Sequence, residues 1–129
     1  MQTKILIIDD DDYMVRLYQR LFEYEQLDVS VARDGQAGID LAAEFQPSLI
    51  MLDIMMPLMN GLDALRILKQ TETTKDIPVL MLTNLNDTAN VQQAKELGAS
   101  DYLLKSNFQS EYIMGVVRKY IPNTAPLAA

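Results

Sequence analysis

The pattern of apolar and polar positions along the chain alternates between two periods. Five short apolar runs are each followed by a longer segment in which apolar residues recur every three or four positions. Several runs are apolar at successive positions, which is typical of parallel strands covered on both faces. The predicted strands are Lys4–Ile8, Val29–Ala32, Ser48–Leu52, Val79–Leu82 and Tyr102–Leu104.

The segments that follow these strands have the periodicity of amphipathic helices. Residues that favour helix ends mark their boundaries: Asp12 and Asp87 stand at expected N-caps, and Gly98 stands where a helix would stop. In the first segment the apolar stripe that we expect to be buried is Met14, Leu17, Leu21 and Tyr24. The predicted helices are Tyr13–Glu25, Gln36–Glu44, Gly61–Gln70, Thr88–Leu97 and Ser110–Tyr120.

A strand–helix unit repeated five times predicts an α/β fold. Short connections between alternating strands and helices imply right-handed crossovers and an open, doubly wound parallel sheet. For five strands the common arrangement is the flavodoxin-like order 2-1-3-4-5, whose crevice lies beyond the carboxyl ends of strands 1 and 3. We expect one domain over residues 1–122, followed at 123–129 by a flexible tail or the start of a linker.

Composition and charge narrow the available chemistry. The 129-residue chain has no Cys and no His, which excludes disulfides, thiolate or imidazole metal ligands, Cys nucleophiles and His bases. A net charge of −7 argues against direct binding of the domain to nucleic-acid phosphates. No apolar stretch is long enough to span a bilayer, and no secretory signal is evident. We therefore expect a soluble, cytoplasmic protein that does not bind membranes.

Chemically useful residues follow four of the predicted strands. Asp9 and Asp10 follow the first strand, and Asp53, Thr83 and Lys105 follow the third, fourth and fifth. In a parallel sheet these strand ends meet at one edge. Each residue alone has an ordinary interpretation as a turn residue, a loop hydroxyl or a solvated charge. Their occurrence together at four strand ends favours a functional site. Asp11 and Asp12, which follow Asp10, fit the capped start of a helix instead.

Three clustered carboxylates favour a divalent cation, because each pair at about 5 Å costs roughly 3 kcal/mol at an effective dielectric of about 20. With only oxygen ligands available, we expect Mg²⁺, with Mn²⁺ as an alternative, retaining some of its waters. A carboxylate, a lysine and a hydroxyl beside this ion suit transfer of a phosphoryl group onto an aspartate. Asp53 is the expected nucleophile, because it stands alone at the end of the central strand. Asp9 and Asp10 are better placed to hold the metal.

These motifs resemble the receiver domains of two-component response regulators, and the resemblance extends from Lys4 to Ile121. Several short motifs together make the match specific. They are Asp9-Asp10, Leu52-Asp53-Ile54-Met55-Met56-Pro57, Met59-Asn60-Gly61, Leu82-Thr83, Gly98-Ala99-Ser100-Asp101-Tyr102 and Lys105.

The resemblance implies that Asp53 accepts a phosphoryl group from a phosphohistidine on a sensor histidine kinase or a histidine phosphotransfer protein. It implies that Asp9, Asp10, Asp53 and the backbone carbonyl of Met55 place Mg²⁺. It also implies a signalling domain that acts on an output protein or a fused output domain, not an enzyme with a separate substrate. Chemistry is then limited to self-phosphorylation from small donors and slow self-dephosphorylation.

The same resemblance assigns further roles and exposes two departures. Thr83 and Lys105 match the pair that contacts the phosphoryl group, and Tyr102 matches the aromatic position coupled to that threonine. Receivers usually follow the lysine with a cis proline, where this chain has Ser106. They usually follow the threonine with a small residue, where this chain has Asn84.

The resemblance also implies an output surface, for which a plain solvated face is the alternative. It lies around Asn90, Tyr102, Lys105, Tyr112 and Lys119.

Two further interpretations compete with the receiver domain. Aspartate-nucleophile phosphatases also use strand-end Asp, Mg²⁺ and Lys, but their nucleophile follows the first strand in an Asp-x-Asp-x-Thr/Val pattern. Read from Asp9 or Asp10, the fifth position here is Tyr13 or Met14. A flavin-binding module of the same fold would place a phosphate in the first strand-to-helix loop, where four consecutive Asp residues would repel it.

In the family, the residues two positions beyond the phosphorylated aspartate and beyond the threonine flank the route of the hydrolytic water. They are Met55 and Leu85 here, and both are apolar. Because neither side chain can orient a water, we expect slow loss of the phosphoryl group.

Overall fold

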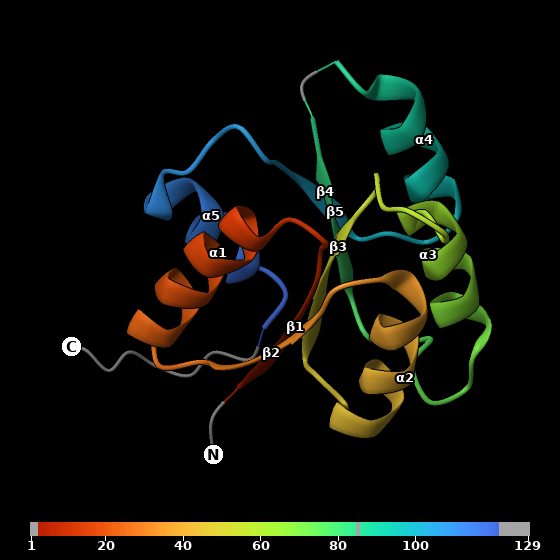
Figure 1. The fold of residues 1–129 in the computed structure, drawn as a ribbon, viewed down its shortest axis with the longest axis horizontal. Helices are drawn as coiled ribbons and strands as arrows, with labels where there is room; N and C mark the ends of the chain where they lie inside the picture. The colour runs from red at the N-terminus through yellow and green to blue at the C-terminus, as the bar shows by residue number, and fades with distance from the viewer. Residues whose placement is uncertain (1–2, 85, 122–129) are drawn as a thin grey trace.

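The computed structural model describes residues 3–84 and 86–121, and its five strands form one parallel sheet. The strand order β2-β1-β3-β4-β5 confirms the predicted 2-1-3-4-5 arrangement (Figure 1). The predictions for Leu85 and for the tail at 123–129 lie outside the described residues. The strands are β1 (Lys4–Ile8), β2 (Asp28–Ala32), β3 (Leu49–Asp53), β4 (Val79–Thr83) and β5 (Asp101–Leu104).

Helices cover both faces of this sheet. Helices α1 and α5 lie on one face, and α2, α3 and α4 lie on the other (Figure 1). Within the described part of the chain, no helix is long and apolar enough to cross a membrane. Apart from α5, which ends at Val117 and not at Tyr120, the observed elements begin and end within one residue of the predicted positions. The helices are α1 (Asp12–Tyr24), α2 (Gly35–Phe45), α3 (Gly61–Gln70), α4 (Thr88–Glu96) and α5 (Ser110–Val117).

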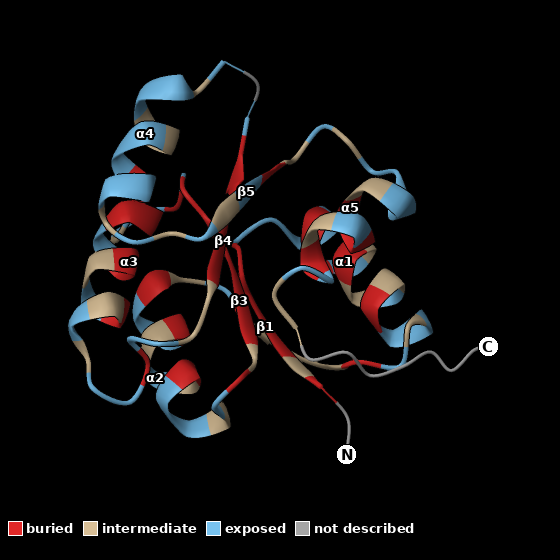
Figure 2. Ribbon diagram, turned by 180° about the vertical axis from the view of Figure 1, so that it is seen from behind, coloured by how far each residue is buried: buried red, intermediate tan, exposed pale blue. Residues whose placement is uncertain are grey.

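The three central strands are buried because helices cover them from both sides. Every residue of β3 and β4 is buried, as Figure 2 shows for the middle of the sheet. Alternate residues face opposite layers: Ile7 belongs to the core beneath α1 and α5, whereas Ile8 belongs to the core beneath α2, α3 and α4. This two-sided packing fixes the carboxyl ends of β1, β3 and β4, where the predicted site residues stand.

Helix boundaries show which predictions of capping residues were right. The prediction of Asp12 as the N-cap of α1 was wrong: Asp11 caps the helix with its side chain, and Asp12 is the first helical residue and pairs with Arg33. Asp87 stands at the N-cap of α4 as predicted, but its side chain accepts a hydrogen bond from the Asn90 side chain at 2.8 Å and caps no backbone N–H of the helix. Gly98 follows α4 with a φ of 108°, the left-handed conformation that suits glycine at a helix end.

The buried face of α1 also differs from the predicted stripe. The structure buries Met14, Val15, Tyr18 and Phe22, while Tyr24 is 83% exposed. Both sets of residues recur every three or four positions, so periodicity alone does not distinguish them. The start of the helix at Asp12 and the position of the sheet set its rotation. As a result Tyr18, which the sequence pattern did not place in the buried stripe, lies in the core.

Gly38 allows α2 to pack closely on the sheet. A Cβ at this position would lie 2.5–2.8 Å from three side-chain carbons of Ile8, which is fully buried. We expect Gly38→Ala to lower the free energy of unfolding by about 1–2 kcal/mol, because overpacking outweighs the helix propensity of alanine.

Gly115→Ala in α5 is the matched control for urea denaturation. Nothing lies within 4 Å of a Cβ at Gly115, so this change should raise stability by about 0.5–1 kcal/mol. Equal effects of the two substitutions would contradict the packing argument.

Candidate functional site

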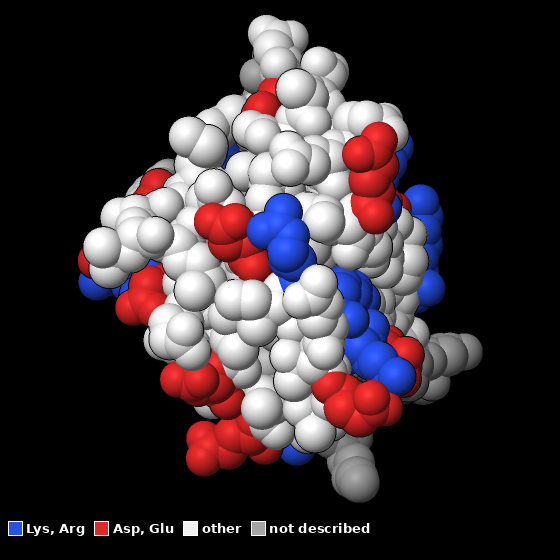
Figure 3. Space-filling view, turned by 90° about the vertical axis from the view of Figure 1, so that its right-hand side faces the viewer, with Lys and Arg blue, Asp and Glu red and all other residues white. Residues whose placement is uncertain are grey.

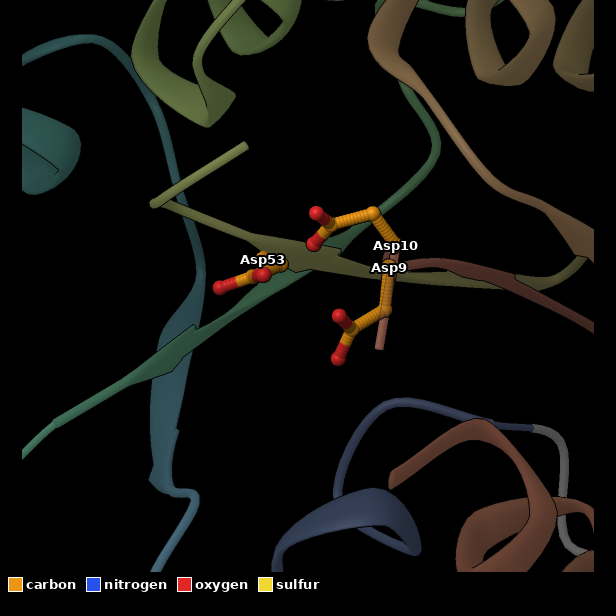
Figure 4. Close-up of side chains that lie close together, drawn as sticks. All are labelled: Asp9, Asp10 and Asp53. Atoms are coloured by element: carbon orange, nitrogen blue, oxygen red, sulfur yellow. The ribbon is translucent and has the colours of Figure 1, made fainter. Parts of the chain in front are cut away.

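The carboxyl ends of four strands bring the predicted site residues to one edge of the sheet. Asp9 follows β1, Asp53 ends β3, Thr83 ends β4 and Lys105 follows β5. Figure 4 shows Asp9 and Asp10 at the end of β1 beside Asp53 at the end of β3. One carboxylate oxygen from each of these three aspartates lies within 4.8 Å of the other two. The sheet order therefore creates the acidic cluster that the sequence predicted.

Two buried carboxylates of this cluster share a lysine. Asp9 is fully buried and its Oδ1 accepts a hydrogen bond from the Asp11 N–H at 3.0 Å. Asp53 is 2% exposed and its Oδ1 accepts from the Met55 N–H at 3.2 Å. The Lys105 Nζ lies 3.4 Å from Asp9 Oδ2 and 3.2 Å from Asp53 Oδ2. The backbone thus fixes one oxygen of each carboxylate, and the lysine bridges the other two.

The charges at this edge are incompletely balanced. Burial and, second to it, the negative charge of Asp9 raise the pKa of Asp53 from 3.8 to about 7, although Lys105 lowers it. Burial alone would lower the pKa of Lys105, but Asp53 and Asp9 outweigh it, so the pKa is raised and the ammonium stays charged. A single lysine therefore faces two buried carboxylates and the exposed Asp10. Additional positive charge would stabilise the cluster.

The donor set fits a hard divalent cation. It offers carboxylate oxygens, which Mg²⁺ and Mn²⁺ prefer. Asp9 Oδ2 is buried and, among the described residues, makes no hydrogen bond, although Lys105 is within ion-pair distance. The backbone of Met55 is also at the site, because its N–H contacts the Asp53 carboxylate, while its side chain is 62% exposed. These four predicted ligand residues, Asp9, Asp10, Asp53 and Met55, are thus adjacent.

A close approach between α3 and the end of β3 positions Asp53. The Gly61 N–H donates to the Ile54 carbonyl at 2.7 Å, and a Cβ at Gly61 would lie 2.1 Å from the Asp53 carbonyl oxygen. Only glycine fits there. Between the strand and the helix the chain turns through Leu58, which has a φ of 69° and a fully exposed side chain. Sequence reasoning included Gly61 in a motif but missed this steric role.

Thr83 and Tyr102 lie at the neighbouring strand ends. Thr83 is buried, and its hydroxyl donates to the Asn84 carbonyl at 3.3 Å. Thr83, Asn84 and Tyr102 line part of an open cavity of about 430 Å³ between β4, β5 and α4. Tyr102 is 37% exposed. The peptide bond between Lys105 and Ser106 is trans, so this loop is built without the cis bond usual after the lysine.

Tyr112 supports the lysine loop, a role that sequence reasoning missed. Its hydroxyl accepts a hydrogen bond from the Leu104 N–H at 3.1 Å, immediately before Lys105. Its side chain is partly buried against the core beneath α1 and α5, although the sequence suggested an exposed output position. A tyrosine among the apolar positions of a helix is the signal that could have indicated this.

Comparison with known proteins identifies the family. The family model of the response regulator receiver domain matches residues 5–118. The chain belongs to this family. It is therefore a receiver domain of the kind found in two-component response regulators, a family of signal transduction proteins.

Similar proteins extend beyond the matched domain. The chain is 42% identical over 121 residues to the DNA-binding dual master transcriptional regulator RpaA of Synechocystis, covering 94% of this chain and 50% of RpaA. It is 41% identical over 105 residues to the response regulator PleD of Caulobacter vibrioides, covering 81% of this chain and 23% of PleD. The chain thus spans half or less of the length of these relatives.

A solved structure shows the same fold. The receiver domain of the sensor histidine kinase PA1611 from Pseudomonas aeruginosa superposes with a TM-score of 0.85 at 18% identity. The match covers 93% of this chain and 98% of that domain. That structure has a magnesium ion coordinated in its active site cleft.

The raised pKa of Asp53 predicts how stability of the receiver domain depends on pH. Because the folded-state pKa of about 7 exceeds the ordinary 3.8, the folded state binds this proton more tightly than the unfolded state does. The contribution of Asp53 to stability therefore falls as pH rises from about 4 to about 7. In buffer free of divalent cations, Asp53→Asn should raise the free energy of unfolding at about pH 8 by on the order of 3–4 kcal/mol.

Urea denaturation of the wild-type and Asp53→Asn proteins at about pH 5 and about pH 8 measures this effect, since the gain should be smaller at the lower pH. Glu44→Gln, at an exposed position of α2, removes one negative charge elsewhere and should change stability little at either pH. A gain that is the same at both pH values would contradict the assignment to Asp53.

Proposed function

We propose that Asp53 of this receiver domain accepts a phosphoryl group from a phosphohistidine on a sensor histidine kinase or a histidine phosphotransfer protein. The observation that carries the proposal is a buried carboxylate 3.2 Å from a lysine and clustered with two further carboxylates. The chain itself has no His, so the donor belongs to another domain or protein. Membership of the receiver family supports the same chemistry.

In the proposed reaction, a carboxylate oxygen of Asp53 attacks phosphorus as the bond to the histidine nitrogen breaks and that nitrogen takes the electron pair. The product is an acyl phosphate on Asp53. Lys105 neutralises the phosphoryl oxygens, and the Thr83 hydroxyl donates a hydrogen bond to one of them. The Met55 N–H keeps one Asp53 oxygen oriented during the attack.

Mg²⁺, with Mn²⁺ as an alternative, is the proposed cofactor. Asp9, Asp10, Asp53 and the carbonyl of Met55 would hold it. When bound, the ion supplies positive charge to the carboxylates and to the phosphoryl oxygens. Because Asp53 has a raised pKa, this charge would also favour the ionised form that attacks. The magnesium ion in the active site cleft of the PA1611 receiver domain supports this choice.

The proposed output is a change of surface around Thr83 and Tyr102, which line one cavity with residues of α4. We place the receiver domain at residues 1–122 and a tail or linker at 123–129.

The name of RpaA describes it as DNA-binding, and the chain spans 50% of its length. For this domain a net charge of −7 disfavours direct contact with nucleic acid. On the side formed by α2, α3 and α4, acidic and basic side chains are interspersed (Figure 3). We expect a signalling role in the cytoplasm without turnover of a separate substrate.

Intact-mass analysis after incubation with Mg²⁺ and acetyl phosphate tests the acceptor chemistry. We expect one phosphoryl adduct on the wild-type protein and on Asp40→Asn, which changes an exposed carboxylate of α2. Asp53→Asn and a metal-chelated sample should give no adduct, because they remove the nucleophile and the cation.

An adduct that persists in Asp53→Asn, or its absence from the wild-type protein, would contradict the proposal and leave a phosphate-independent interaction module. Turnover of an aryl phosphate ester would instead favour an aspartate-nucleophile phosphatase. A yellow purified protein would favour the flavin-binding alternative.

The apolar side chain of Met55, beside the proposed acyl phosphate, bears on how long the phosphoryl group is retained. Met55 is exposed beside Asp53 and cannot orient a water, and the same chemistry applies to Leu85, which lies outside the described residues. We expect Met55→Asn combined with Leu85→Glu to shorten the half-life of the phosphorylated protein several-fold, as followed by intact mass after removal of the donor. Met55→Leu combined with Leu85→Met, which stays apolar, should leave the half-life unchanged. A half-life that is unchanged or longer in the polar variant would contradict this explanation.

A further inference from the structure

Two buried polar atoms of the described residues lack a hydrogen-bond partner: Asp9 Oδ2 and the Tyr18 hydroxyl oxygen. Asp9 is fully buried, and Tyr18 is 1% exposed. The first atom belongs to the acidic cluster, whereas the second belongs to a side chain of the apolar core beneath α1 and α5. Buried hydroxyls in proteins are nearly always hydrogen-bonded, so a tyrosine hydroxyl held in an apolar core needs an explanation.

The tyrosine ring is fixed in the core beneath α1 and α5. Tyr18 belongs to the same buried cluster as Ile7, and its ring stacks on Phe22 with centroids 6.2 Å apart and planes 11° apart. Side chains on a helix lean toward its N-terminus. Because α1 begins at Asp12, just after Asp9, the Tyr18 side chain leans toward the edge of the sheet that carries the acidic cluster.

Electrostatics support this direction. Burial raises the pKa of Tyr18, and the negative charges of Asp9 and Asp53 raise it further. Tyr112 also contributes, and its own hydroxyl already accepts the Leu104 N–H. Tyr18 and Ile7 of β1 share the core beneath α1 and α5, and the Asp9 side chain at the end of β1 points toward the same side of the sheet (Figure 4).

The Tyr18 hydroxyl and Asp9 Oδ2, which has Lys105 within ion-pair distance but no hydrogen bond, have complementary hydrogen-bonding capacity. A tyrosine hydroxyl can donate one proton, whereas an ionised carboxylate can only accept. A buried water can accept the proton of the hydroxyl and donate one of its own to the carboxylate, and such waters commonly link buried groups that are too far apart for direct contact. One water between them would satisfy both atoms.

We propose that Tyr18 is a positioning residue for Asp9, acting through a water shared by its hydroxyl and Asp9 Oδ2. The Asp11 N–H already fixes Oδ1 at 3.0 Å, so the second contact sets the orientation of the carboxylate plane toward the cation site. Lys105, at 3.4 Å, balances its charge but, as a flexible side chain, orients it less. The inference rests on the Mg²⁺ site of the proposed function and extends it to a residue outside the strand ends.

The decisive measurement is the Mg²⁺ dissociation constant from isothermal titration calorimetry. Tyr18→Phe keeps the ring and its stacking on Phe22 and removes only the hydroxyl, so we expect Mg²⁺ to bind about 10-fold more weakly, as for loss of other groups that orient metal ligands. Tyr24→Phe, on the exposed side of the same helix, should bind like the wild-type protein.

A double-mutant cycle separates positioning from a general loss of packing. If Tyr18 acts through Asp9, removing its hydroxyl in an Asp9→Asn background should cause no further weakening of Mg²⁺ binding. An equal weakening in both backgrounds would overturn the inference, because the effect would then be independent of Asp9.

Fluorine NMR of the wild-type sequence labelled with fluorotyrosine gives a second readout. The chain has six tyrosines, and Tyr18 is the least exposed of those described, so its resonance should be the one least broadened by a soluble paramagnetic probe. We expect this resonance to shift when Mg²⁺ is added. This measurement does not depend on the folding of a variant, and a resonance that does not move would overturn the inference.

The outcomes for the inference and for the proposed function are distinct. Wild-type protein that does not bind Mg²⁺ would overturn the metal site and, with it, the role of Tyr18. Wild-type binding with an unchanged dissociation constant in Tyr18→Phe would overturn the role of Tyr18 alone. The role of Tyr18 is supported if Tyr18→Phe weakens Mg²⁺ binding, if this weakening is absent in the Asp9→Asn background, and if the resonance of the buried tyrosine shifts when Mg²⁺ is added.

Discussion

Repulsion among carboxylates at one edge of the sheet is the constraint on which the rest of this structure depends. Asp9 and Asp53 are buried because they stand at the ends of central strands, and Lys105 reaches both from the end of β5. Burial and the charge of Asp9 keep the pKa of Asp53 raised although Lys105 lowers it. The sheet holds these groups together because apolar packing on both its faces offsets the repulsion. This edge is therefore where added positive charge or a phosphoryl group changes the energy most.

The two apolar cores connect this edge to both layers of helices. Alternate residues of β1 pack into the core beneath α1 and α5 and into the core beneath α2, α3 and α4. A structural change at the strand ends can therefore reach both layers of helices. Tyr18 and Tyr112 lie on the first side, and Thr83 and Tyr102 line a cavity beside α4. A receiver domain that signals by a change of surface needs such contacts, because an isolated charged site would leave the helices unaffected.

The sequence predicted the features that depend on local pattern and strand register. Continuous apolar runs indicate buried parallel strands, and residues at the strand ends are expected to meet because the carboxyl ends of parallel strands lie at one edge of the sheet. Features set by rotation of an element or by close contact were not predictable. The burial of Tyr18 in place of Tyr24 depends on how α1 turns toward the sheet. Gly61 is needed because a Cβ there would lie 2.1 Å from the Asp53 carbonyl oxygen, a close packing that no sequence pattern records.

The turn between β3 and α3 contains a residue whose backbone conformation lowers the stability of the loop beside the site. Leu58 holds a left-handed backbone, with a φ of 69°, while its side chain is fully exposed and so gains little from packing. For a residue with a Cβ this conformation costs about 1 kcal/mol, which Gly or Asn would largely avoid. Replacing Leu58 by Gly or Asn would therefore raise the free energy of unfolding without changing a buried side chain. Such a gain could offset the losses caused by changes to the charged residues nearby.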